Sequence, residues 1–437
     1  MLVEYSFGNF KSFKEKNTLS MLGVKSFKEH GESNVFTQDK FRILKSAVVY
    51  GNNAGGKSNL VVGISVMKSL VLNSFRNALD EKGSLFVEKF LLNTKSEEAP
   101  SEFEVVFFQK DVRYRYGFAI NDGRVIEEWL FHSAGKKEVP LFERDEKGVQ
   151  YLNKTSFSEG EEYKDKSKLR NNVLFISLIA QFNDKGIANE VISWFKKVSI
   201  ISGMADTAYS RITFEKFKRD ENFKRWLSLI VQDLEIANIT TEEVGLKNDF
   251  QIGRANIKFS MVADGKEQSD SEYSLKGTMI NTWHKKYDEN NLLTGAVPFN
   301  FISQESEGTK KFINLLGPWY DTIKNGSILI VDELDSRLHT RITTKLIELF
   351  NNNRNKNAQL IFTSHDVNLL DKDLFRRDQI WFVEKDQFGA SSLYSLADFK
   401  AEQVRNTSSF SKNYLSGKYG AVSHIEINEK MEDLIYG

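Results

Sequence analysis

The chain has 437 residues, of which 40% are apolar and 27% are charged, and its 60 lysines and arginines balance 60 aspartates and glutamates. This length provides material for more than one domain. The balanced charge excludes a global attraction to nucleic acid or to an anionic membrane, so any such binding has to be local. The absence of cysteine excludes disulfides, thiolate zinc sites and thiol nucleophiles, and it suits a reducing cytoplasm.

The N-terminal sequence MLVEYSFGNFKSFKEK has no basic segment followed by an uninterrupted apolar one. Nowhere in the chain do eighteen apolar residues follow one another. We therefore expect a cytoplasmic protein that has no membrane partner and is not secreted.

Residues 1–160 are expected to form mainly strands. The segments FEVVFF, Phe103 to Phe108, and YRYGFAI, Tyr114 to Ile120, are rich in aromatic and β-branched residues, with Asp111 between them. This pattern predicts a hairpin. Around residue 160 the charged sequence SEGEEYKDKSKLRNN indicates a surface loop and a change of organisation.

Residues 161–295 are expected to form a mainly helical insertion. Two sets of apolar residues recur at spacings of three and four, namely Ile187, Val191, Trp194, Phe195 and Val198, and then Phe223, Trp226, Leu227, Ile230 and Leu234. Such stripes are typical of amphipathic helices with one buried face. They could serve only the core of the insertion, or the insertion could also carry a surface for a partner.

Residues 296–437 are expected to return to an α/β organisation. The short apolar runs SILIVDE, LIFTSH and IWFVEK alternate with helical stretches. Near-continuous apolar strands separated by helices are the pattern of a parallel sheet with crossover connections.

The most specific motif is GNNAGGKS, residues 51–58, which has the spacing of a phosphate-binding loop. The apolar AVVY before it predicts a strand, and the periodic NLVVGISVMKSLVL after it predicts a helix, so the motif has the required context. Glycines suit such a loop because a β-carbon would stop the backbone N–H groups from turning toward phosphate oxygens. A glycine turn that caps an ordinary helix is the alternative.

The motif assigns chemical roles to its residues. Lys57 supplies a cation for the β- and γ-phosphates, the Ser58 hydroxyl can ligate magnesium, and the start of the helix adds the positive end of its dipole. The predicted nucleotide-binding residues are Gly51, Asn52, Asn53, Ala54, Gly55, Gly56, Lys57, Ser58 and Asn59.

An acidic pair follows the apolar run Ile328 to Val331. Asp332 and Glu333 stand at the carboxyl end of this predicted strand, where open α/β sheets bind ligands. Asp332 is expected to bind magnesium through water, and Glu333 to polarise the attacking water; two acids that simply end a strand are the alternative. His365 ends the next apolar run, where it could contact the γ-phosphate or be an ordinary surface or core residue.

The order of GNNAGGKS, ILIVDELDSRLH and FTSH, with Asp335 two residues after Glu333, resembles the ATPase heads of the ABC class. Within that class the resemblance is closest to the RecF, SMC and OLD-like branch, and the first two segments resemble its Walker A and Walker B motifs. The resemblance implies an ABC-type head, with a mixed or antiparallel lobe beside a parallel P-loop sheet. It also implies hydrolysis of ATP to ADP and phosphate with Mg²⁺, with Glu333 and His365 as catalytic residues and Asp335 in the D-loop.

The stretch ISQESEGTKKF, Ile302 to Phe312, resembles the signature motif of the same class. In relatives, the signature serine and glycine bind the γ-phosphate held by a second subunit, so that two ATP molecules are sandwiched in a head-to-tail dimer. A hydroxyl and a bare N–H at a helix start do form an anion site, although a plain helix cap is the alternative. The corresponding residues are Ser306, Glu307, Gly308 and Thr309.

More narrowly, FGNFKSF, ESEGTKK, DELDSRLH, RRDQIWFVEKD and YLSGKYGA resemble the AAA15 family of bacterial ATPases. Members of that family are often encoded beside a partner effector and act in anti-phage defence or abortive infection. The resemblance implies a homodimer or higher homo-oligomer and a separately encoded effector protein, for example a nuclease.

Some positions depart from the wider class or are not fixed by it. Ala54 replaces a glycine, Glu307 replaces the second glycine of transporter ATPases, and Thr309 replaces their glutamine, which argues against a transporter. The class also has a magnesium-sensing residue in its first lobe. Gln109, at the end of FEVVFFQ, is a candidate metal ligand for that role, and an ordinary polar turn residue is the alternative.

Two functions follow from these motifs. The leading interpretation is an ATP-hydrolysing switch that dimerises on ATP and acts on an effector. The alternative is a RecF- or SMC-like DNA-binding repair ATPase, in which the basic and aromatic residues of KFKRDENFKRW bind nucleic acid. The interleaved acids Asp220 and Glu221 favour a solvated helix face for that segment. Too little chain follows His365 for an OLD-like nuclease domain, and a P-loop kinase would not need the acidic pair together with the signature stretch.

Overall fold

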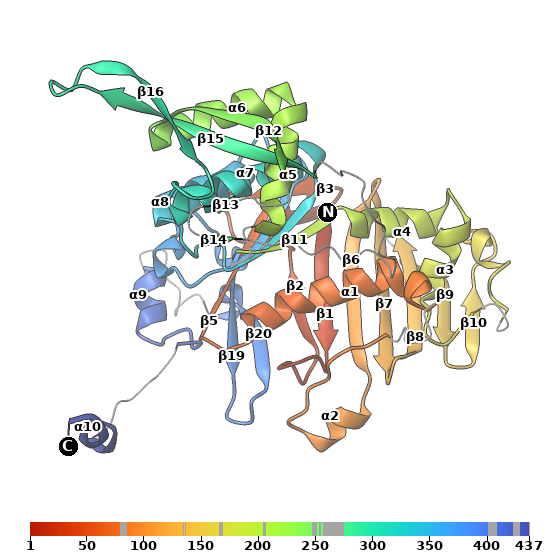
Figure 1. The fold of residues 1–437 in the computed structure, drawn as a ribbon. Helices are drawn as coiled ribbons and strands as arrows, with labels where there is room; N and C mark the ends of the chain where they lie inside the picture. The colour runs from red at the N-terminus through yellow and green to blue at the C-terminus, as the bar shows by residue number, and fades with distance from the viewer. Residues whose placement is uncertain are drawn as a thin grey trace. The chain divides into compact units, whose positions relative to one another are not determined.

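The computed structural model describes residues 1–78, 85–133, 135, 137–165, 169–203, 207–246, 251–252, 255–256, 275–400, 409–422 and 429–436. The chain divides into two compact units (Figure 1). The first comprises Met1–Ala205 and Asp321–Gly437, and the second comprises Asp206–Tyr320.

The first unit contains a seven-stranded antiparallel sheet in the order β10-β9-β8-β7-β6-β1-β2. Its strands are β1 (Leu2–Gly8), β2 (Asn17–Ser20), β6 (Ser101–Gln109), β7 (Val112–Asn121), β8 (Arg124–Ser133), β9 (Val139–Asp145) and β10 (Gly148–Leu152). Along β6 the buried Phe103, Val105 and Phe107 alternate with partly exposed residues, as expected for a sheet with one face on the core. The predicted hairpin is confirmed, because β6 and β7 pair from Ser101 with Ile120 to Gln109 with Val112.

The same unit contains a six-stranded sheet in the order β11-β17-β18-β5-β19-β20. Its strands are β5 (Ser46–Gly51), β11 (Val198–Ser202), β17 (Ile328–Asp332), β18 (Gln359–Thr363), β19 (Ile380–Lys385) and β20 (Ser391–Ser395). The first five strands in this order run parallel and β20 runs antiparallel to β19. These parallel pairings confirm the predicted parallel sheet. Strands β5 and β18 are buried along their whole length, as expected for strands with both faces covered.

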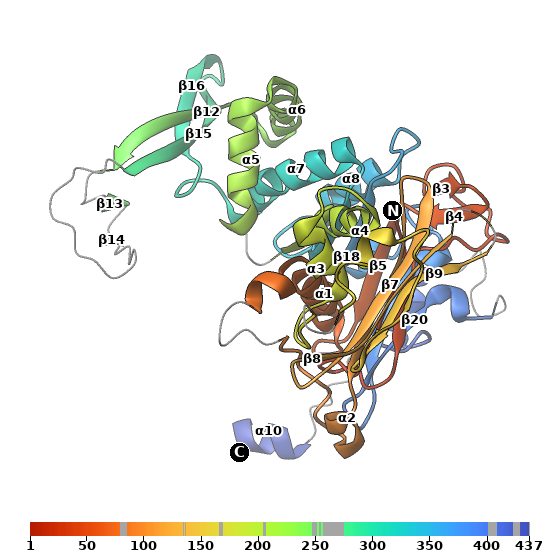
Figure 2. The same ribbon diagram turned by 90° about the vertical axis from the view of Figure 1, so that its right-hand side faces the viewer.

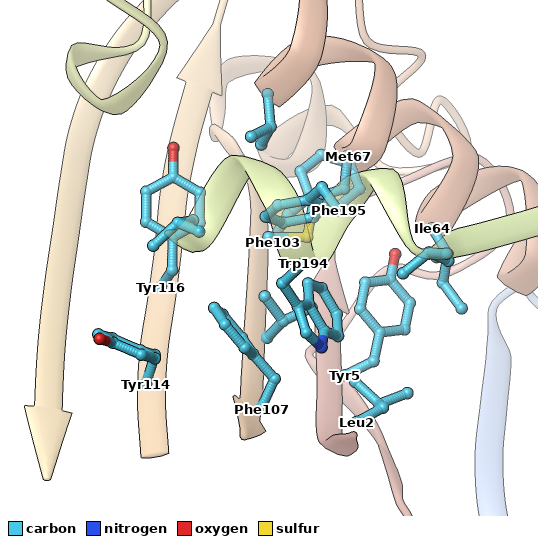
Figure 3. Close-up of a cluster of buried hydrophobic side chains, with 14 of the residues drawn as sticks. Leu2, Tyr5, Ile64, Met67, Phe103, Phe107, Tyr114, Tyr116, Trp194 and Phe195 are labelled. Atoms are coloured by element: carbon cyan, nitrogen blue, oxygen red, sulfur yellow. The ribbon is translucent and has the colours of Figure 1, made fainter. Parts of the chain in front are cut away.

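Helix α1 (Lys57–Asn77) contributes buried residues to one hydrophobic core that also contains residues of both sheets. Its residues Ile64 and Met67 lie among aromatic side chains of the antiparallel sheet and of α4 (Ile187–Lys196), where the Trp194 ring stacks on Phe107 at 4.2 Å between centroids (Figure 3). Figure 2 shows α1, α3 (Phe175–Phe182) and α4 on one face of the antiparallel sheet. Among the described helices only α1 is long and apolar enough to cross a membrane, and 44% of its apolar window is buried inside the protein.

The remaining elements of the first unit are short. They are β3 (Val35–Gln38), β4 (Phe41–Leu44), α2 (Thr94–Glu98), η1 (Ser158–Gly160), α8 (Thr340–Phe350), η3 (Val367–Leu369), η4 (Arg377–Gln379), η5 (Leu396–Asp398), α9 (Phe410–Leu415) and α10 (Glu429–Tyr436). The first unit extends past the predicted boundary at residue 160, because β11 pairs with β17 from Val198 with Ile328 to Ser202 with Asp332. The stripe of Trp194 and Phe195 is correspondingly buried in the core of this unit.

The second unit combines helices with a three-stranded antiparallel sheet in the order β12-β15-β16. Its elements are α5 (Thr207–Arg219), α6 (Glu221–Val231), η2 (Gln232–Leu234), β12 (Ile236–Leu246), β13 (Gln251–Ile252), β14 (Ala255–Asn256), β15 (Leu275–Tyr287), β16 (Leu293–Asn300) and α7 (Glu307–Asn325), which begins in this unit. The second apolar stripe is buried at Phe223 and Leu227, as predicted. The strands were not predicted, and part of the 161–295 insertion lies outside the described residues.

Candidate functional site

Three neighbouring parallel strands end at one edge of the six-stranded sheet. Strand β18 lies between β17 and β5, with Phe362 opposite Val331 and Thr363 opposite Val49. Since parallel strands point the same way, the segments that follow them meet at the same edge. The phosphate loop, the acidic pair and His365 follow β5, β17 and β18 respectively, so the fold brings together segments far apart in the sequence.

The phosphate loop has a backbone that only some residues can adopt. Gly56 has a φ of 120°, and a β-carbon there would lie 2.6 Å from the Ser391 Oγ. A β-carbon on Gly51 would lie 2.2 Å from the Val383 carbonyl oxygen. Ala54 has a φ of 60°, in the left-handed region. The glycines at 51 and 56 are therefore required by close approach and by backbone conformation.

Lys57 is held over this loop. Its Nζ donates hydrogen bonds to the carbonyl oxygens of Gly51, at 2.7 Å, and Asn52, at 3.0 Å. Burial lowers the pKa of Lys57 below its usual value, and the carboxylates of Asp332, Glu333 and Asp335 partly offset that effect. The cation therefore lies near the acidic pair, where it can bind an anionic group placed against the loop.

The acidic pair is fixed by a buried threonine. The Thr363 Oγ1 donates a hydrogen bond to the Asp332 Oδ1 at 2.7 Å and accepts one from the Glu333 N–H at 2.7 Å. Glu333 has a φ of 55°, a strained conformation for a residue of this size that the surrounding bonds have to hold. Thr363 was not singled out from the sequence, where its only signal is its place two residues before His365 at the end of an apolar run.

Asp335 and His365 are in direct contact. The Asp335 carboxylate accepts the backbone N–H of His365, with N to Oδ2 and N to Oδ1 distances of 3.1 and 3.3 Å. The His365 side chain is exposed to solvent, whereas Asp335 is half-buried. The loops after β17 and β18 are thus tied to each other beside the acidic pair.

The oxygen donors at this edge fit magnesium. Ser58 is exposed in the first turn of α1, and Asp332 is half-buried with one oxygen on Thr363. Mg²⁺ at nucleotide sites takes one or two protein oxygens and completes its octahedron with phosphates and water. Within the described part of the chain no three His, Cys, Asp or Glu side chains gather into a metal-binding group.

Gln109 does not belong to this site. It is buried at the end of β6, where its Oε1 accepts a hydrogen bond from the Lys197 Nζ at 3.4 Å. Lys197 directly precedes β11 and therefore lies at the amino ends of the parallel strands. The suggestion that Gln109 is a metal ligand was wrong, because the phosphate loop and the acids lie at the opposite edge of the sheet.

The signature residues lie in the second unit and form an exposed helix start. The Ser306 Oγ accepts the Thr309 N–H at 3.1 Å and shares a hydrogen bond with the Thr309 Oγ1 at 2.8 Å, so Ser306 caps α7. Glu307 pairs with Lys310 at 2.5 Å. Ser306 and Glu307 are exposed to solvent. Ser306 therefore caps α7, and because this helix start is exposed it is also accessible to an anion.

The basic segment of α5 and α6 is largely neutralised by its own acids. Ion pairs join Lys216 with Asp220 at 3.6 Å, Arg219 with Glu215 at 3.1 Å and Lys224 with Glu221 at 4.0 Å, and the remaining basic residues of the segment are Lys218 and Arg225. Phe217 and Phe223 are buried, and Trp226 packs on Tyr320 at 5.3 Å between ring centroids. The buried rings of Phe217 and Phe223 cannot stack on bases, and basic side chains of the segment are paired with acids, so these observations favour a solvated helix face over a nucleic-acid surface.

The topology and the site define a P-loop ATPase with an ABC-type head. Residues 46–189 and 206–371 match the AAA_21 family, described as "AAA domain, putative AbiEii toxin, Type IV TA system". The chain belongs to this family and is an ATPase. No relative among curated proteins matches it.

Solved structures that are distantly similar to the chain include two SMC heads. One is the SMC head domain from Thermotoga maritima, with 14% identity, a TM-score of 0.41, and coverage of 90% of this chain and 98% of that one. The other is an SMC head bound to the C-terminal winged-helix domain of ScpA, with 14% identity, a TM-score of 0.42, and coverage of 92% and 99%. The strand order of the six-stranded sheet and the phosphate loop after β5 define the fold.

Proposed function

We propose that this ATPase is a cytoplasmic switch that forms an ATP-sandwiched homodimer and regulates a separately encoded effector in bacterial anti-phage defence. The observation that carries the proposal is the exposed start of α7, capped by Ser306. It offers a hydroxyl and backbone N–H groups at a helix start, an anion site of the kind that closes a nucleotide pocket in ABC-class relatives. The AbiEii description of the family and the resemblance to AAA15 proteins support the effector and the defence role.

Each residue of the site has a proposed role in hydrolysis. The loop N–H groups and Lys57 bind the triphosphate, and Ser58 and Asp332 hold Mg²⁺, which supplies positive charge against the phosphates. Glu333 orients the attacking water and accepts its proton, and its position is fixed by the bond from its N–H to Thr363. His365 contacts the γ-phosphate, and Asp335 holds the backbone of His365. Ser306 and Gly308 of a second copy close the pocket.

The Glu333→Gln variant tests the dimer. Glutamine cannot accept the proton, so bound ATP should persist and stabilise the pair. We expect light scattering to give about twice the monomer mass when ATP is added to Glu333→Gln, and the monomer mass for Lys57→Ala under the same conditions. An unchanged mass of Glu333→Gln with saturating ATP would refute the sandwich.

The effector is tested by expression from the native gene neighbourhood. The protein encoded beside the ATPase should co-purify with Glu333→Gln in an amount that differs with and without ATP, because the dimer state is proposed to control it. If the co-purifying protein is found in equal amounts with and without ATP although the dimer still forms, the proposal that the ATPase regulates this effector would be refuted. The assignment as an ATPase would stand.

A further inference from the structure

A phosphate loop can present its N–H groups to a ligand only if its carbonyl groups are satisfied on the other side. In this loop the carbonyls of Gly51 and Asn52 accept hydrogen bonds from Lys57. The Gly55 carbonyl accepts a hydrogen bond from the Ser391 Oγ at 2.6 Å, and this bond is buried. Ser391 is 336 positions from Gly55 in the sequence and belongs to none of the motifs described above.

Ser391 is held rigidly by the parallel sheet. It is the first residue of β20, opposite Lys385 of β19, and it is only 2% exposed. Strand β19 in turn pairs with β5, with Val383 opposite Gly51 at the start of the loop. The hydroxyl that fixes the Gly55 carbonyl therefore comes from β20, which is separated from β5, the strand that carries the loop, by β19 alone.

Ser12 completes the support from the N-terminal segment. Its carbonyl accepts the Ser391 N–H at 2.7 Å, and its Oγ accepts a hydrogen bond from the Asn59 Nδ2 at 2.8 Å. The turn that presents Ser12 is closed by paired backbone hydrogen bonds between the buried Phe10 and Phe13, at 2.8 and 2.9 Å. Two segments from opposite ends of the sequence thus meet under the loop.

The two hydroxyls also fill the space beside Gly56. A β-carbon at that position would lie 2.6 Å from the Ser391 Oγ and 2.9 Å from the Ser12 Oγ. These distances are shorter than any ordinary contact of a β-carbon, so the serines and the glycine fit only as a set. The unusual backbone at Gly56 is where the loop enters helix α1.

We propose that Ser391 and Ser12 are positioning residues that hold the phosphate loop in the conformation that binds a polyphosphate. They act through the loop backbone and touch neither the metal residues nor the acidic pair in the contacts described above. Because the loop holds the phosphates equally before and during reaction, loss of this support should weaken nucleotide binding and leave turnover at saturation unchanged. The inference concerns one chain and is independent of the proposed dimer and effector.

The test compares Ser391→Ala with Ser392→Ala, which removes an exposed hydroxyl from the next position of the same strand. Binding of ATP and ADP is measured with fluorescent nucleotide analogues, together with kcat, KM and the thermal midpoint without nucleotide. We expect Ser391→Ala to bind both nucleotides about tenfold more weakly, as one lost buried hydrogen bond predicts, with kcat within about twofold. Ser392→Ala should match the wild type in every measurement.

A second pair of variants separates positioning from general stability. Ser391→Thr keeps the donor and should restore most of the affinity, and Ser12→Ala, which removes the acceptor of Asn59, should weaken binding about threefold. The proposal is overturned if Ser391→Ala binds ATP and ADP as the wild type does. It is also overturned if Ser391→Ala lowers the thermal midpoint and kcat together while affinity stays unchanged, since that is the result of a purely structural role.

Discussion

Replacing Thr363 with valine removes the group that fixes both acids of the site. Valine keeps the shape of the side chain, and Thr363 is fully buried, so the change is confined to the hydroxyl. That hydroxyl donates to the Asp332 carboxylate at 2.7 Å and accepts the Glu333 N–H at 2.7 Å. A hydrogen bond to a charged group contributes about 1.5–3 kcal/mol, and a buried N–H left without a partner costs about 1–3 kcal/mol.

If about 2–3 kcal/mol of this loss appears in the transition state, kcat should fall roughly 30- to 150-fold. Phosphate release at saturating ATP and Mg²⁺ measures kcat directly. Binding of nucleotide without Mg²⁺ should remain near that of the wild type, because the loop and Lys57 do not contact Thr363 in the bonds described. Thr363→Ser is the control, since serine keeps the hydroxyl. Wild-type turnover in Thr363→Val, or an equal loss in Thr363→Ser, would refute the reasoning.

Two further changes test the electrostatics of the fold. Burial holds the pKa of Lys57 below the ordinary 10.5, so ATP affinity should be constant at pH values below this lowered pKa and should fall as the pH rises through it. When ATP affinity is measured from pH 7 to 10, the decline should begin at a lower pH in the wild type than in Lys57→Arg, because arginine stays charged. Equal pH profiles of the two proteins would contradict this expectation. Glu128→Ala should lower the free energy of unfolding by about 3–5 kcal/mol in urea titrations, because it leaves Arg144, 3.3 Å away and buried, without its partner. Adding Arg144→Met should recover part of that loss, and a cost below about 1 kcal/mol for the single change would contradict the account.

The features that could be predicted from the sequence are those with strong local patterns. The phosphate loop lies between an apolar strand and a periodic helix, and the acids follow an apolar run, so neighbouring residues identify these elements. The parallel order of strands also follows from this pattern, because fully apolar strands that alternate with helices need both faces covered. The convergence of Lys57 with Asp332 and Glu333 was predictable for the same reason, since carboxyl ends of parallel strands share an edge.

The failures concern contacts between segments distant in sequence. Gln109 ends a strand of the antiparallel sheet, and such a strand end can lie at either edge of the molecule, so its distance from the loop was not determined by local pattern. Ser391 and Thr363 are small polar residues in ordinary strands, and only the tertiary fold shows which atoms they contact. The sheet of the second unit was missed because β16 is mostly exposed and lacks the alternation that marks a half-buried strand.

The central claim, that one chain closes the pocket of another, is tested most directly by mixing two inactive variants. Lys57→Ala lacks the lysine that binds the phosphates, and Ser306→Arg blocks the start of α7. Each variant assayed by itself should therefore hydrolyse ATP only at the background rate. In a head-to-tail dimer a mixed pair contains one intact site, built from Lys57 of one copy and Ser306 of the other. An equal mixture should then recover between about a quarter of wild-type activity, if all pairs form at random, and about half, if only mixed pairs form, because each mixed pair has one intact site of two. Background activity in the mixture, with mixed dimers present, would contradict the account.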